Sequence, residues 1–396
     1  MKTRFIFNLL SLSLAIALSS CATTGSASSL SSKPSSTSHV SSGWTIHEDA
    51  EFGGICIDTS IADFMKDGYQ FGDSFNIEFS NGVSYQDIPF YDGYYVKTGD
   101  ILLIGYPGYE YLELCKNNTS GFYDSFNFPE NVTVQITLNT AQKYKTTQEA
   151  LGLKYSDDRS TYASDEVFAN YRNVKYGRIG KNVLYRGASP VNNVHNRASY
   201  VDEFIEKDKV AYIIDLADTE DNMKSYLADP NFKSNYAKSL YNKGKVDFLG
   251  LNMGYTADSY GQTIAVACRK MLNNDGPYYF HCTEGKDRTG FFAIVLEALM
   301  GATDEQLEED YMITYNNYYG VNKTDTPDLY QAIVDLRFSE FVDFFCLEAA
   351  VGTLTLEAKA YNYLKRSGLT DAELEDLKEL LATDIEHSEE VELPFI

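Results

Sequence analysis

Positive charge is scarce in this sequence. Its 396 residues include 33 Lys and Arg against 57 Asp and Glu, which gives a net charge of −24. Nucleic-acid-binding proteins draw most of their affinity from Lys and Arg on phosphates, so this balance argues against nucleic acid as a partner. The net charge also repels anionic substrates at long range. A phosphate site in this chain must therefore be built locally, from backbone N–H groups and a few well-placed cations.

Histidine is scarce as well. The five histidines are separated along the chain, and none has the spacing of a metal-binding motif. The sequence therefore predicts no metal centre and no other cofactor. The five are His39, His47, His195, His281 and His387.

The start of the chain is basic and then apolar. Lys2 and Arg4 introduce a nearly apolar stretch over 5–18, which is typical of a signal peptide and short for a membrane span. The stretch leads through Leu and two Ser to Cys21, a pattern that resembles the lipoprotein box of bacterial exported proteins. The resemblance implies cleavage before Cys21 and lipid attachment to it; the alternative is an ordinary secretory signal. We therefore expect an exported protein, lipid-anchored to the outer face of the bacterial cell membrane.

The residues after the signal peptide (1–20) are polar. Residues 21–43 are rich in Ser, Thr and Gly, which predicts a flexible tether. Five cysteines remain beyond Cys21, an odd number that one unpaired reactive thiol would explain in an exported protein. Cys56 and Cys115 belong to the same folded region, where they either form a disulfide or stay free.

Residues 44–140 have the pattern of short strands separated by turns. Apolar and polar residues alternate over 75–79 and again over 132–138, as in half-buried strands. The regular spacing favours a small β-barrel or sandwich. The stretch over 71–138 resembles the C-terminal β-domain of the S-adenosylmethionine hydroxide adenosyltransferases. The catalytic domain of that family has no counterpart in this sequence, so the resemblance implies a β fold, and we expect an accessory domain.

The pattern changes after a polar linker over 141–165. Over 166–385 amphipathic helical segments, such as 198–207, alternate with short apolar runs typical of buried strands. This alternation predicts an α/β fold with a central sheet flanked by helices. Hydrophobic residues make up 44% of the chain, enough for a sizeable core. We expect a solvated acidic tail over 386–396.

The chemistry is concentrated in the ten residues over 281–290, which read His-Cys-Thr-Glu-Gly-Lys-Asp-Arg-Thr-Gly. They follow a predicted buried strand over 278–280 and precede a predicted helix. A curled loop between Cys282 and Arg288 would point its N–H groups, and the positive end of the helix, at one centre that suits a phosphate dianion. Arg288 can hold two phosphate oxygens with its planar fork.

The same positive surroundings favour the thiolate form of Cys282. A thiolate behind a bound phosphoryl group is placed for in-line attack, which gives a phosphocysteine intermediate. Glycine at two positions permits close backbone approach, and the Thr289 hydroxyl can help the sulfur leave in the second step. The expected phosphate-binding residues are Thr283, Glu284, Gly285, Lys286, Thr289 and Gly290.

The Cys-x5-Arg-Thr pattern resembles the active-site loop of the protein tyrosine phosphatases. The full stretch resembles their bacterial branch, which also handles phosphoinositides, and the segments 184–189 and 213–216 resemble two further motifs of that branch, with Ala217 where the branch has arginine. The resemblance spans 165–345 and implies a cysteine-phosphatase fold and phosphomonoester hydrolysis. It also implies that His281 orders the loop and supports the thiolate.

The leaving group needs a proton donor near the scissile oxygen. The Trp-Pro-Asp sequence of the larger tyrosine phosphatases does not occur here. In the branch with Lys-Asp-Arg, the loop aspartate is credited with this role, and it corresponds to Asp287. Asp218 and Asp258 are the alternatives. Lys286 adds a second cation that suits a substrate with more than one phosphate, or else pairs with a nearby acid.

Two functions of different classes follow. The first is a phosphotyrosine protein phosphatase, with phosphoinositides or inositol phosphates as the alternative substrates. The second is a cell-surface binding module in which the phosphatase fold is inactive and only recognises phosphorylated ligands. The intact set of Cys282, Arg288 and Thr289 favours the hydrolase.

Replacement of Cys21 tests the predicted anchor. Cys21→Ala should leave the membrane fraction, because the lipid on the cysteine supplies the membrane affinity, and a single acyl chain gives only marginal binding, so more than one is implied. The measurement is fractionation of cells that express either the intact chain or the variant, with mass analysis of the amino-terminal peptide. A variant that remains equally membrane-bound would remove the lipoprotein interpretation.

Overall fold

The computed structural model describes residues 40–346 and 354–386. The predicted signal peptide, Cys21 and most of the predicted tether lie outside the described residues, as does the acidic tail after residue 386. Among the residues described, no helix has both the length and the apolar character needed to cross a bilayer.

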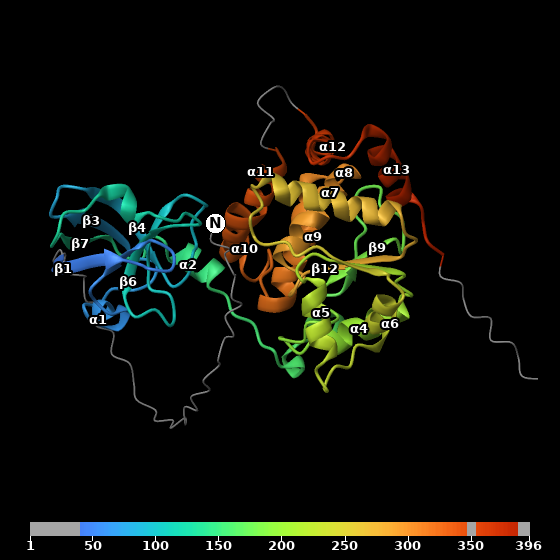
Figure 1. The fold of residues 1–396 in the computed structure, drawn as a ribbon, viewed down its shortest axis with the longest axis horizontal. Helices are drawn as coiled ribbons and strands as arrows, with labels where there is room; N and C mark the ends of the chain where they lie inside the picture. The colour runs from blue at the N-terminus through green and yellow to red at the C-terminus, as the bar shows by residue number, and fades with distance from the viewer. Residues whose placement is uncertain (1–39, 347–353, 387–396) are drawn as a thin grey trace, which may run out of the picture. The chain divides into compact units, whose positions relative to one another are not determined.

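The first domain is a closed β-barrel with the strand order β1-β2-β6-β5-β4-β3-β7 (Figure 1). Neighbouring strands are antiparallel except β4 and β5. The predicted mostly-β domain is therefore confirmed. β1 begins inside the range assigned to the tether, because Val40 pairs with Thr137. The strands are β1 (Val40–Glu48), β2 (Ile55–Ile57), β3 (Ser74–Phe79), β4 (Ser84–Tyr91), β5 (Ile101–Ile104), β6 (Leu112–Lys116) and β7 (Thr133–Thr140).

The two cysteines of the barrel are free. They lie on the neighbouring strands β2 and β6, where Cys56 is directly opposite Glu113. Cys115 is two residues further along β6, which makes it a diagonal neighbour of Cys56. Residues in diagonal positions are about 7–8 Å apart, and their Cβ atoms only somewhat closer. The Cβ atoms of a disulfide are about 3.5–4.5 Å apart. The strand register thus keeps the two thiols separate.

The second domain contains a five-stranded sheet in the order β11-β10-β12-β9-β8. The first four strands in this order are parallel, and β8 is antiparallel to β9. This is the predicted α/β architecture with a central sheet. The strands are β8 (Arg172–Asn173), β9 (Leu184–Gly187), β10 (Tyr212–Asp215), β11 (Val246–Phe248) and β12 (Tyr278–His281).

Helices cover both faces of this sheet. Along β10, Tyr212 and Ile214 belong to one buried cluster and Ile213 to another, as expected when successive side chains point to opposite faces. In Figure 1, α7 and α8 lie above the sheet, and α4, α5 and α6 lie below it. These helices are α4 (Ala198–Lys207), α5 (Glu220–Leu227), α6 (Asn235–Asn242), α7 (Asp258–Leu272) and α8 (Asp287–Leu299).

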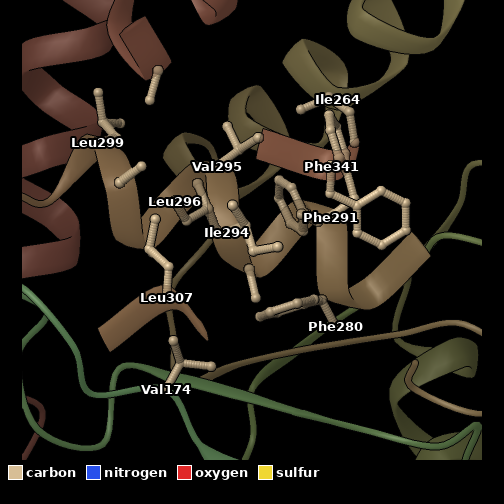
Figure 2. Close-up of a cluster of buried hydrophobic side chains, with 14 of the residues drawn as sticks. Val174, Ile264, Phe280, Phe291, Ile294, Val295, Leu296, Leu299, Leu307 and Phe341 are labelled. Atoms are coloured by element: carbon tan, nitrogen blue, oxygen red, sulfur yellow. The ribbon is translucent and has the colours of Figure 1, made fainter. Parts of the chain in front are cut away.

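Helix α8 is the central helix of the domain. Every residue from Thr289 to Leu299 is buried, and its apolar side chains pack against α7, β12, α9 and α11 (Figure 2). The segment that precedes α8 is therefore tied to a rigid element. The remaining helices are α1 (Ile61–Lys66), α2 (Lys145–Leu151), α3 (Asp165–Ala169), α9 (Asp304–Tyr319), α10 (Pro327–Ile333), α11 (Ser339–Cys346), α12 (Leu356–Arg366) and α13 (Asp371–Ala382).

Candidate active site

The ten-residue stretch joins the central strand to the central helix. His281 ends β12 and Asp287 begins α8. In the sheet, His281 is the register partner of Asp215 on β10 and of Gly187 on β9. Residues 282–288, which we call the cysteine loop, therefore lie at the carboxyl ends of the parallel strands. Open α/β sheets bind their ligands at this edge.

Gly285 allows the cysteine loop to curl against β9. Its φ angle is +72°, a conformation that favours glycine, and a Cβ atom at this position would lie 2.2 Å from the carbonyl oxygen of Gly187. The carbonyl oxygen of Gly285 accepts hydrogen bonds from Arg186 at 3.0 Å and from Asn170 at 3.3 Å. The turn is thus fixed by close packing on one side and by two side-chain donors.

A buried ion network supports the loop from behind. The carboxylate of Asp310 on α9 accepts from Arg186 at 2.5 Å and from Arg172 at 2.8 Å. Arg186 is fully buried and Asp310 nearly so. Breaking a buried pair by removing one partner typically costs about 3–5 kcal/mol. The Arg186 that holds Gly285 is therefore itself firmly held.

Arg288 is anchored at one end of its guanidinium. Its Nη1 donates to the carbonyl oxygen of Leu251 at 2.9 Å, and its Nη2 lies 3.5 Å from the hydroxyl of Thr283. Its Nε is buried and has no hydrogen-bond partner within the described part of the chain. Burial lowers the pKa of Arg288, but its neighbours, Cys282 first and then Tyr255, Tyr260 and Asp287, together raise that pKa above its ordinary value. The guanidinium can therefore offer the free side of its fork to an oxyanion.

The amino end of α8 also faces the loop without a side-chain cap. Its N-cap residue, Lys286, makes no side-chain capping bond, so the N–H groups of the first turn remain available to an anion. Thr289 lies in this first turn, and its hydroxyl is buried without a hydrogen-bond partner among the described residues. Cys282 is only 3% exposed. The thiol and the hydroxyl are thus both shielded from solvent, and the hydroxyl lies in the uncapped first turn of α8.

His281 is neutral at physiological pH, because burial lowers its pKa to about 4. Its Nδ1 lies 3.1 Å from the carbonyl oxygen of Cys282, which identifies Nδ1 as the protonated nitrogen that donates to this oxygen. Its Nε2 lies 3.8 Å from Oδ2 of Asp215, and burial raises the pKa of Asp215 to about 6. His281 therefore orders the backbone at the cysteine without adding a charge.

The three candidate proton donors have different positions. Asp287 is in the loop, with its side chain 30% exposed. Asp218 is only 7% exposed and accepts from the Tyr226 hydroxyl at 3.0 Å; burial, together with Asp215, raises its pKa to about 6. Asp258 begins α7 with an exposed side chain.

All predicted residues of the loop are brought together, but the network behind the loop was not predicted. A signal for it exists in the sequence. Leu307, Asp310, Tyr311 and Thr314 follow the spacing of one helix face, so two polar residues occupy an otherwise apolar stripe. Across the described ranges, no cluster of three or more His, Cys, Asp or Glu side chains could hold a metal ion.

Residues 168–383 match the family model of the tyrosine phosphatase family. Among solved structures, the core catalytic domain of the PP-IP phosphatase SIW14 from S. cerevisiae, in complex with citrate, is similar at 17% identity, over 42% of this chain and 85% of that chain, with a TM-score of 0.26. The comparison with curated proteins gives no match.

A pair of glycine substitutions tests the packing of the loop. Gly285 and Gly244 have similar φ angles, +72° and +67°, but a Cβ atom at Gly244 meets open space. Alanine at either position carries the left-handed backbone cost of about 1–2 kcal/mol, and Gly285→Ala adds overpacking against Gly187, typically about 1–3 kcal/mol. Gly285→Ala should therefore lower the free energy of unfolding more than Gly244→Ala in urea denaturation. Equal losses would show that the close contact does not constrain the loop.

Proposed function

Because the chain belongs to the tyrosine phosphatase family, we propose that it hydrolyses phosphotyrosine in proteins through a phosphocysteine intermediate on Cys282. The observation that carries this proposal is the arrangement of the cysteine loop. A shielded cysteine, an uncapped helix end and a guanidinium with a free Nε converge in a loop of fixed shape. This arrangement fits one phosphoryl group.

In the first step, the thiolate of Cys282 attacks phosphorus and the bond from phosphorus to the tyrosine oxygen breaks. Asp287 gives its proton to the departing oxygen. Arg288 and the N–H groups of the loop hold the non-bridging oxygens, whose charge they stabilise in the transition state. The products of this step are the free tyrosine and the phosphocysteine.

In the second step, water attacks phosphorus and the bond to sulfur breaks. The carboxylate of Asp287 takes a proton from the water, which restores the acid. The Thr289 hydroxyl donates a hydrogen bond to the departing thiolate. Phosphate is released, and the enzyme returns to its starting state.

Exposure favours Asp287 over Asp218 as the proton donor. The leaving group of a protein substrate must lie toward solvent, where Asp287 is partly exposed. Asp218 has one oxygen bonded to Tyr226 and the other buried without a partner among the described residues. This buried position does not suit proton transfer to an exposed leaving group. Asp258 is exposed at the start of α7, and within the described ranges its side chain makes no hydrogen bond or ion pair with the loop.

We also propose that the protein acts outside the cytoplasm, anchored through lipid on Cys21. The amino-terminal sequence supports this location. The barrel then belongs to the exported part of the chain as an accessory domain. Its resemblance to the C-terminal β-domain of the adenosyltransferases supports a β fold and assigns it no reaction.

Substitution of the nucleophile tests the covalent mechanism. Cys282→Ser should abolish hydrolysis of para-nitrophenyl phosphate but retain binding of vanadate, because Arg288 and the loop N–H groups remain. The matched control is Cys346→Ser, which changes another free cysteine and should keep normal activity. Turnover and calorimetric vanadate binding are measured on purified protein. Substantial activity in Cys282→Ser would refute the covalent route, and an inactive wild type that still binds vanadate would favour the binding module.

The proton donor is tested by comparing leaving groups. Asp287→Asn should slow hydrolysis of phosphotyrosine peptides by about 10²–10⁴-fold, and activated aryl phosphates much less, because their leaving groups scarcely need a proton. Equal losses on both substrates would exclude Asp287. If Asp218 were the donor, its activity would require the protonated form, so kcat would fall as pH rises through about 6. That limb of the pH profile would then disappear in Asp218→Asn.

A further inference from the structure

Lys286 is paired within the cysteine loop. Its ammonium lies 3.2 Å from Oε2 of Glu284 and 3.8 Å from Oδ2 of Asp287. It also lies within hydrogen-bond distance of the Tyr319 hydroxyl, at 3.3 Å. The side chain is 19% exposed. A lysine at the mouth of a phosphate site would attract a second phosphate on the substrate, but here its charge is already matched by the closer carboxylate, that of Glu284.

Glu284 is held in place by contacts from other segments. Its backbone carbonyl accepts from the Tyr318 hydroxyl at 2.6 Å, and its carboxylate interacts with Tyr155 and lies 3.8 Å from Nε2 of His195. The rings of Tyr155 and Tyr318 stack with centroids 5.0 Å apart. Burial alone would raise the pKa of Glu284. Lys286, Tyr155 and His195 together have the larger effect, so the pKa lies below its ordinary value. The carboxylate is therefore ionised and fixed beside the lysine.

This pairing separates two classes of substrate. A single phosphoryl group needs Arg288 and the loop N–H groups, and among the described residues the carboxylate of Glu284 pairs with Lys286 instead. A second phosphate on the same molecule would reach Lys286 only by displacing Glu284, and it would then lie near that carboxylate. We infer that Glu284 is a specificity-determining residue, which restricts the site to esters with one phosphate, such as phosphotyrosine, and disfavours multiply phosphorylated inositols and their lipids. The inference rests on the proposed function and names its substrate class.

Glu284→Gln tests this inference in the full chain. Glutamine has the same size and keeps a partner for Tyr155, but it frees the charge of Lys286. The values of kcat/KM are measured for a phosphotyrosine peptide, for phytate and for a water-soluble phosphatidylinositol bisphosphate. For each multiply phosphorylated substrate, kcat/KM relative to that for the peptide should rise by about tenfold or more. The change should come mainly from a lower KM, because a like charge is removed beside the second phosphate. A gain for phytate alone would identify the soluble inositol phosphate as the excluded class, and a gain for both would identify the shared headgroup chemistry.

Two further variants separate charge from loop shape. Lys286→Gln added to Glu284→Gln should remove the gain, because the freed ammonium is its cause. The control is Glu308→Gln on α9, because Glu308 is also paired with a lysine and a tyrosine. Its carboxylate lies 2.8 Å from the ammonium of Lys323 and accepts a hydrogen bond from the hydroxyl of Tyr330 at 2.8 Å. This control should leave the substrate ratio unchanged.

The outcomes separate this inference from the proposed function. An unchanged ratio in Glu284→Gln, or equal losses on all substrates, would overturn the inference and reduce Glu284 to a shaping role. A wild-type protein that already prefers the multiply phosphorylated substrates would also overturn it, while leaving the phosphatase reaction intact. A wild-type protein with no phosphomonoesterase activity would instead overturn the proposed function.

Discussion

The hydrogen bond from Arg186 to the carbonyl oxygen of Gly285 is the interaction on which the site depends. It fixes the middle of the cysteine loop from behind, and Arg186 is in turn held by Asp310. The charges of this network are buried, so each partner must stay in place to avoid an unpaired charge in the core. A loop held in this way keeps its N–H groups directed at one point before any ligand arrives. Such preorganisation is what stabilises charge in a transition state.

The site must bind an anion in a chain whose net charge repels anions. The chain carries a net charge of −24, yet its substrate is an anion. The attraction is local, because Arg288 and the amino end of α8 act at short range within a shielded loop, where screening by water is weak. Neutral His281 supports the loop without adding charge. Lys286 does not broaden this positive region, since Glu284 matches it.

The sequence predicted the elements whose patterns are local. The helix over 198–207 is α4, and the strand–loop–helix order around Cys282 is as expected from the apolar runs that flank it. The motif over 281–290 also identified the residues of the cysteine loop as parts of one site. The contacts between Arg186 and Asp310, or between Arg288 and Leu251, join segments far apart in the chain, so no local pattern reveals them. The choice between Asp287 and Asp218 likewise depends on burial, which the sequence does not give.

The central claim is that Cys282 carries the phosphoryl group during turnover. The most direct measurement is a rapid denaturing quench of the protein during the first turnover of a phosphotyrosine peptide, followed by mass analysis of the peptide that contains Cys282. The account predicts one phosphoryl group on the sulfur of Cys282, formed as fast as free tyrosine peptide appears. Turnover without any phosphorylated enzyme, or with the phosphoryl group on another residue, would contradict it.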